Sequence, residues 1–177
     1  GADVEKVNNA QIEFGESGGS LEMEGGTLSA STISIATSND VVNSVAIGSS
    51  VESVSDTTLE LSKGSSNIDI SSNVVENVSV VASSKKPTTL EVDSADVSGF
   101  TLSVARSTAN LSLDSDNKIE GTTLDSSTKG NFAASIDAAN KDTAISNTKG
   151  GDLEASFNAK TINPTISNSG KGTVEAN

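Results

Sequence analysis

Apolar and polar residues alternate along this chain in short stretches, and the stretches return at a nearly constant interval. The steps of the clearest row are 22, 21, 21, 21 and 21 residues. Its members are Ile68, Leu90, Leu111, Phe132, Leu153 and Val174. A fixed period of this length is typical of a solenoid, in which each repeat adds one coil and buries its apolar residues against the next. We therefore expect these six residues to form the core and to hold the assembly of coils together.

Two further rows run in phase with the first. The second row is Val54, Val75, Val97, Ile119 and, after a gap of two periods that passes Ala139-Asn140, Ile162. The third row is Phe14, Ile35, Leu59, Val80, Leu102, Leu124, Ile145 and Ile166. Around each row the polarity alternates with a period of two, which is the pattern of a half-buried strand, and polar turn-forming residues separate the rows.

The three rows predict an all-β protein built as a β-solenoid of about seven coils with a period of about 21 residues. A β-helix and a stack of β-arches both fit this pattern. We expect one solenoid domain over residues 12–177, preceded by a lead segment at 1–11. The pattern stops after one strand at residues 173–177, which predicts an incomplete last coil.

An exchange of residue sizes supports stacking of the coils in register. At the second inward position of the first strand, Ile70, Val92 and Leu113 give way to Ala134 and Ala155. Two residues later, Ser72, Ser94 and Ser115 give way to Ile136 and Phe157. We interpret this exchange as conservation of volume in a shared core.

Composition narrows the range of functions. The chain has 33% hydrophobic and 2% aromatic residues, no Cys and no His, and a formal charge of −13. Without Cys there are no disulfides, and the negative charge argues against nucleic acid, which requires a basic footprint. No stretch approaches the roughly 18 apolar residues of a membrane span. The chain has no His, Cys or Tyr and a single Arg, Arg106, for acid–base or nucleophilic chemistry, so we expect neither an enzyme nor a small-molecule substrate.

One row of acidic residues is a candidate cation site. Asp69, Glu91, Glu154 and Glu175 follow the first inward residue of their coils, whereas Ser112 and Ala133 interrupt the row. Stacked carboxylates repel each other, and Ca²⁺ accepts such oxygen ligands. A solvated acidic face is the favoured interpretation, and Ca²⁺ bound by these four residues is the alternative. No other cofactor is expected.

The composition of the coils, rich in Ser, Thr, Asn and Gly, and their periodic pattern, as in TLEVDSADVSGFTLSVARST at residues 89–108, resemble those of the solenoid stalks of bacterial and archaeal surface proteins. These include filamentous-haemagglutinin-like and autotransporter-like stalks and amyloid-like sheath or fibre subunits. The resemblance implies an extracellular location at the cell surface or in the cell envelope. The leading hypothesis is a structural protein that self-assembles as a homo-oligomer or polymer in a fibre, sheath or surface layer. The alternative is an adhesin stalk segment that binds a host, a glycan or an abiotic surface, and the incomplete last coil equally fits a fragment of a longer solenoid.

Overall fold

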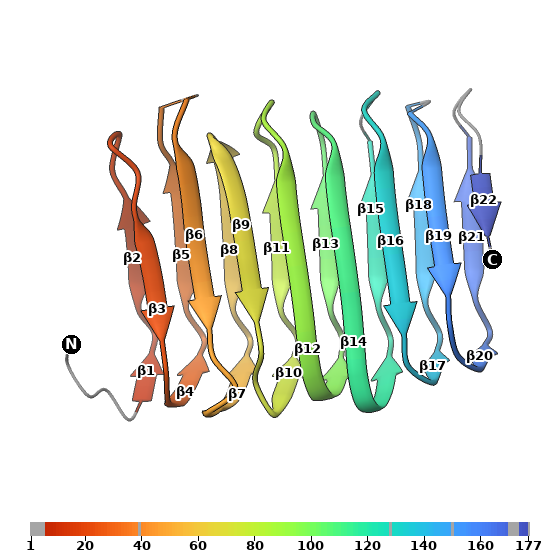
Figure 1. The fold of residues 1–177 in the computed structure, drawn as a ribbon, viewed down its shortest axis with the longest axis horizontal. Coiled ribbons are helices and arrows are strands. Elements are labelled where there is room, and N and C mark those ends of the chain that lie inside the picture. The colour runs from red at the N-terminus through yellow and green to blue at the C-terminus, as the bar shows by residue number, and fades with distance from the viewer. Residues whose placement is uncertain (1–5, 39, 128, 150, 170–173, 177) are drawn as a thin grey trace.

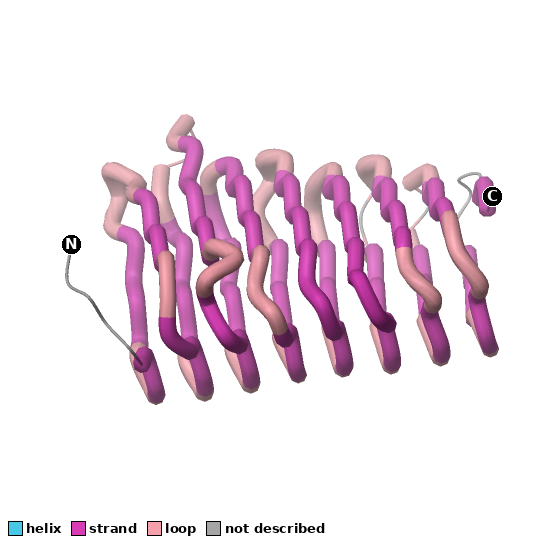
Figure 2. Tube along the Cα trace, turned by 60° about the horizontal axis from the view of Figure 1, so that its bottom comes forward, coloured by secondary structure: helices cyan, strands magenta, loops and turns pink. Residues whose placement is uncertain are grey.

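The computed structural model describes residues 6–38, 40–127, 129–149, 151–169 and 174–176. All regular elements in this part of the chain are strands, and the neighbouring strands described there pair in parallel. The strands wind into a rod with three flat faces, which confirms the predicted β-solenoid (Figure 1). Figure 2 shows the successive coils stacked along the rod axis. Each coil contributes one strand to each face in turn, and we call the faces 1, 2 and 3 in chain order.

Face 2 is a sheet of its own, with eight parallel strands and therefore seven steps from coil to coil. Its strands are β2 (Gln11–Phe14), β5 (Thr32–Ala36), β8 (Thr58–Lys63), β11 (Ser79–Ala82), β13 (Thr101–Val104), β15 (Thr123–Ser126), β18 (Ala144–Asn147) and β21 (Thr165–Asn168).

Faces 1 and 3 share the second sheet, because two long strands bend around the corner between them. These two strands are β12 (Thr88–Ser98) and β14 (Ala109–Glu120), which begin on face 3 and end on face 1. Face 1 also contains β1 (Lys6–Asn8), β4 (Gly26–Ser29), β7 (Val51–Ser55), β10 (Val74–Glu76), β17 (Asn140–Lys141) and β20 (Thr161–Ile162). Face 3 also contains β3 (Ser20–Met23), β6 (Val42–Ile47), β9 (Ser65–Ile70), β16 (Phe132–Asp137), β19 (Leu153–Phe157) and β22 (Val174–Ala176). Strand β1 lies within the expected lead segment and pairs with β4.

The core is the space between the three faces, and inward residues stack there in columns. Face 2 gives the clearest column, which runs from Ile12 at one end of the rod to Ile166 at the other. The members between those ends are fully buried aliphatic side chains, as in Leu59 and Leu102. The inward positions of one strand thus pack on the same positions of the next coil, as nearest-neighbour stacking requires.

The corner between faces 1 and 2 repeats one backbone conformation in every coil. One residue there has a positive φ, between 47° and 65°. The residues are Asn9, Ala30, Asp56, Asn77, Gly99, Gly121, Asp142 and Asn163. Gly adopts this left-handed conformation without a steric penalty, and Asn and Asp tolerate it because their side chains bond locally. Two of the Asn side chains also link neighbouring coils: Asn77 donates to Asp56 at 3.2 Å, and Asn163 donates to Asp142 at 3.1 Å.

The first predicted row divides into two columns, because the strand register moves by two residues between β14 and β16. Leu111 pairs with Ala134, and Phe132 pairs with Ala109. Ile68 and Leu90 therefore stack with Leu111, whereas Leu153 and Val174 continue from Phe132. A shift of two residues keeps every side chain on its own face, since the side-chain period of a strand is two.

The predicted exchange of volumes is therefore wrong. Leu113 pairs with Ile136, which in turn pairs with Phe157, so large residues stack on large ones. The spacing of apolar residues in the sequence does not reveal the register shift, because the corner after β16 is shorter than the corresponding corner of the preceding coil. Only four positions separate Ile136 from Asn140, against six between their partners Leu113 and Ile119.

The other two rows also need correction at single positions. Ile119 pairs with Asn140, where the second row has its gap, but Asn140 pairs with Thr161 and not with Ile162. Ile162 therefore leaves the row: it lies on the outside of face 1 and is 41% exposed. The partner of Leu59 is Ile33, because the corners after β5 and after β6 are both longer than those of the preceding coil; Ile35 pairs with Leu61. Asn140 is nevertheless buried, so a polar residue occupies the core position at which the second row has its gap.

Candidate functional site

The acidic residues proposed as Ca²⁺ ligands lie on the outside of face 3, but they do not form one row. Asp69 and Glu91 are in register on neighbouring coils and are exposed, and Ser71 Oγ donates to Asp69 Oδ1 at 3.0 Å. Glu154 and Glu175 pair in a different column, two residues nearer the start of their strands. The side chain of Glu175 lies outside the described residues.

This placement separates the four acids into two pairs. A Ca²⁺ ion takes 6–8 oxygen ligands, usually from several groups that converge on one point. In the described ranges there is no cluster of three or more His, Cys, Asp or Glu residues with the geometry of a metal site. The Ca²⁺ alternative is thus left with two adjacent carboxylates, Asp69 and Glu91, on a solvated surface.

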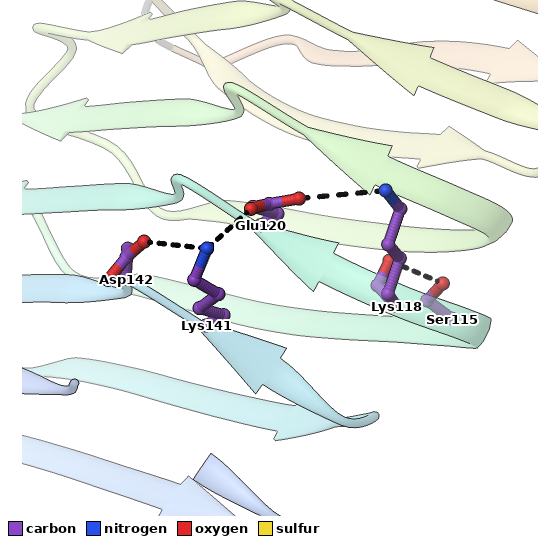
Figure 3. Close-up of polar contacts among 5 residues, drawn as sticks. All are labelled: Ser115, Lys118, Glu120, Lys141 and Asp142. Atoms are coloured by element: carbon purple, nitrogen blue, oxygen red, sulfur yellow. Dashed lines mark hydrogen bonds and ion pairs between the residues drawn. The ribbon is translucent and has the colours of Figure 1, made fainter. Parts of the chain in front are cut away.

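A cluster of charged side chains links two coils on face 1, next to its corner with face 2 (Figure 3). Lys141 Nζ lies 3.1 Å from Glu120 Oε1 and 3.6 Å from Asp142 Oδ2, and Lys118 Nζ lies 3.5 Å from Glu120 Oε2. The hydrogen bond and the charge of Lys141 lower the pKa of Glu120, to which Lys118 also contributes. The hydrogen bond and the charge of Glu120 in turn raise the pKa of Lys141. These groups are exposed, so solvent screens the pairs and we assign the cluster a modest structural role.

Face 3 has a shallow depression of about 160 Å³. It is lined by Asn110, Leu111, Ala133, Ala134, Ser135, Glu154 and Ser156. The depression lies where Ala133 and Ala134 replace larger side chains after the register shift. Its polar groups are hydroxyls, an amide and one carboxylate, and this set lacks a paired acid and base for catalysis.

Strand edges at both ends of the rod have no partner among the described residues. At one end these are the outer edges of β1, β2 and β3, and at the other end those of β20 and β21. Core side chains are only partly buried there: Ile12, Phe14 and Leu21 at the first end, and Ile166 at the second. An open edge offers unpaired N–H and C=O groups to any further strand.

Sequence reasoning missed how the basic residues are distributed. Six of them lie at the corner between faces 2 and 3, in successive coils from β8 to β19. We call this row the basic edge: Lys63, Lys85, Lys86, Arg106, Lys129 and Lys149. The signal was available, because from Lys63 onward one or two cations recur at intervals close to the apolar period.

Together these features define a three-faced parallel β-solenoid whose candidate sites are open strand edges and charged surfaces, not an enclosed pocket. In the part of the chain that the structure describes, no helix has the length and apolar character to cross a membrane. No family model matches the sequence, and comparison with curated proteins and with solved structures finds no similar protein.

Proposed function

We propose that the chain is a non-catalytic structural subunit that assembles end to end into an extracellular fibre, sheath or surface layer. In this proposal the parallel strand stacking inside one copy continues into the next copy. The rod contributes stiffness and length, and the cell surface or envelope is its setting.

The observation that carries the proposal is the match between the two open ends. Ile12 and Ile166 are the first and last members of one column in the core of face 2, and both are only partly buried. Placing β21 of one copy next to β2 of another continues that column with isoleucine on isoleucine. It also pairs the free backbone edges of both strands, which removes the unfavourable exposure of each.

The proposal is tested by charges placed inside or outside one terminal strand. Ile12→Lys introduces a charge on the inward side of β2, where a stacked copy would bury it, whereas Gln11→Lys introduces the same charge on the exposed side. We expect wild type and Gln11→Lys to form elongated assemblies in electron micrographs and light scattering. We expect Ile12→Lys to assemble far less, with an unchanged circular dichroism spectrum.

The opposite end provides a second matched pair, Ile166→Lys and Thr165→Lys in β21. Each inward variant keeps one intact end, so an equimolar mixture of Ile12→Lys and Ile166→Lys should form rods two copies long and none longer. A wild-type chain that remains monomeric at millimolar concentration contradicts end-to-end assembly and favours the alternative of an adhesin stalk segment.

A further inference from the structure

We infer that face 3 is a self-complementary docking surface, on which a second copy of the chain packs side by side with its rod pointing in the same direction. The inference rests on the proposed self-assembly for its biological setting. It uses different residues from the end-to-end contact, however, so the two can be tested separately. Face 3 is the face toward the viewer in Figure 1.

The first observation is the basic edge along one side of face 3, at the top in Figure 1. Lys63, Lys85, Arg106, Lys129 and Lys149 are exposed, and none forms an ion pair with a described residue. Lys86, which is less exposed, lies 3.6 Å from Asp40. A chain with a formal charge of −13 therefore concentrates uncompensated positive charge along a single line.

The second observation is an acidic edge along the opposite side of the same face. Asp93, Asp114 and Asp137 are in register on three successive coils, are exposed, and have no cation beside them in the described part of the chain. Like charges directly opposite each other on neighbouring strands are unfavourable. This column therefore has unfavourable electrostatics within one copy, which a column of cations from outside would relieve.

The two edges correspond coil by coil. Strand β12 follows Lys86 and reaches Asp93, β14 follows Arg106 and reaches Asp114, and β16 follows Lys129 and ends at Asp137. Face 3 of each of these three coils is thus positive where its strand begins and negative where it ends. The distance between the edges is that of a strand of about six residues, or about 20 Å.

This charge pattern selects one arrangement of two copies. A two-fold axis parallel to the rods brings the basic edge of each copy over the acidic edge of the other, with coil opposite coil. A two-fold axis parallel to the strands brings like charges together and reverses one rod. Electrostatic complementarity suppresses such like-charge arrangements and sets the register. The favoured dimer is therefore face to face, with parallel rods.

The partner that fits best is a second copy because the charges repeat with the coil spacing. From β12 to β16, cations and carboxylates both recur at about 4.8 Å along the rod, so each of these three coils makes the same contact as the previous one without any adjustment of length. Between the two edges, the outward residues of β14 and β16 are neutral, as at Ser112, Ala133 and Ser135, which permits close approach. On the neighbouring strands β12 and β19, Glu91 and Glu154 are the exposed charges between the edges. Val42, the most exposed large apolar residue in the described ranges, also lies on this face.

The available area is sufficient for a stable contact. Eight coils at about 4.8 Å and a strand width of about 20 Å give roughly 800 Å² on each copy, which is the size of a standard protein interface.

The experiment uses charge reversal in the full chain with Ile12→Lys added, so that end-to-end stacking does not contribute. The basic-edge variant carries Arg106→Glu and Lys129→Glu, and the acidic-edge variant carries Asp114→Lys and Asp137→Lys. By sedimentation velocity we expect the parent to dimerise, each variant alone to lose at least tenfold in dimer affinity, and an equimolar mixture to form a heterodimer. Reversal of two exposed acids on face 1, Glu52→Lys and Glu76→Lys, should leave the dimer unchanged.

A monomeric parent, or variants that dimerise as well as the parent, would overturn the inference. The same holds if the parent stays monomeric but binds polyphosphate through the basic edge, because the partner is then a polyanion and not a second copy. End-to-end assembly is scored separately on the chain without Ile12→Lys, so failure of one contact does not conceal the other.

Rod direction is tested by cross-linking, which is specific because the chain has no Cys of its own. Ser44 is exposed on face 3 in the second coil, and Ser156 lies on the same face near the other end. With parallel rods, Ser44→Cys should be linked to itself across the dimer by a short bis-maleimide. Linkage only in a mixture of Ser44→Cys with Ser156→Cys indicates antiparallel rods and overturns the proposed arrangement.

Discussion

Replacing Gly64 with alanine tests how closely the corner between β8 and β9 packs against the long corner after β5 in the preceding coil. Gly64 has a φ of +74°, and a Cβ there would lie 2.4 Å from Thr37 Oγ1, 2.8 Å from Asn43 Nδ2 and 2.9 Å from Val41 O. Asn43 is fully buried, and its amide donates to Thr37 Oγ1 at 2.8 Å and to Ser65 O at 3.1 Å. The new methyl group cannot enter without displacing these partners.

Gly121 is a matched control for the conformational part of this effect. Its φ of +65° is similar, but a Cβ there would meet nothing closer than the backbone N of Gly99 at 3.9 Å. The left-handed conformation costs alanine about 1–2 kcal/mol, and the reduced freedom of the unfolded chain returns about 0.4–1 kcal/mol. Gly121→Ala should therefore lower the free energy of unfolding by about 1 kcal/mol.

Gly64→Ala carries the same conformational cost and also disrupts buried hydrogen bonds. A buried polar group left without its partner costs about 1–3 kcal/mol. With the amide of Asn43 displaced, the total loss should be about 2–4 kcal/mol. The difference between the two alanine variants, about 1–3 kcal/mol, isolates the contribution of the packed corner.

Both variants can be compared with wild type by urea denaturation at 25 °C, followed by far-UV circular dichroism. Equal losses in the two variants, within about 0.5 kcal/mol, would refute the assignment of the corner to steric packing around Asn43. In that case the cost would belong to the backbone conformation alone.

Three other substitutions have definite expected results. Ala30→Gly should raise the free energy of unfolding by about 0.5–1 kcal/mol, because Ala30 adopts a φ of 48° that glycine accepts without strain, and a decrease in urea resistance would contradict this. Leu102→Ala removes a fully buried side chain and should cost about 2–5 kcal/mol in thermal unfolding, whereas Thr101→Ala, on the outside of the same strand, should change stability by no more than about 0.5 kcal/mol. Lys141 lowers the pKa of Glu120 below its ordinary value of 4.5, so the ion pair stabilises the fold above that pH and the stability is lost as the pH falls through the lowered pKa. Glu120→Gln should therefore have a lower free energy of unfolding than wild type at neutral pH and the same free energy of unfolding in acid. A difference in stability that persists at pH 2 would exclude this ion pair as its cause.

The periodic spacing of aliphatic residues was enough to predict the fold class. Ile68, Leu90 and Leu111 stack as expected, because inward residues of a solenoid must recur once per coil. Spacing did not reveal which residue of each strand lies opposite which. Phe132 lies 21 residues after Leu111 but pairs with Ala109. One corner is longer and the next is shorter, so the number of residues per coil stays nearly constant although the register changes.

The candidate sites could be predicted less well than the fold. The acidic row was read from a constant offset to the apolar row, so the register shift that moves Phe132 also separates Glu154 from the column of Glu91. The basic edge was overlooked because its members are not at one fixed offset, and corners of different length still bring them to the same side of the rod.

The alternation of apolar and polar residues is sufficient to predict a stack of coils with an aliphatic interior, because a strict alternation repeated at a fixed period has few other ways to bury its apolar side. The register, the number of faces and the neighbours of each charge follow from the three-dimensional arrangement and not from the spacing. Register depends on corner lengths and on backbone conformations such as the left-handed residue at each corner between faces 1 and 2. These features change which surface residues meet while leaving the inward–outward alternation intact, since a shift of two residues in a strand preserves its face.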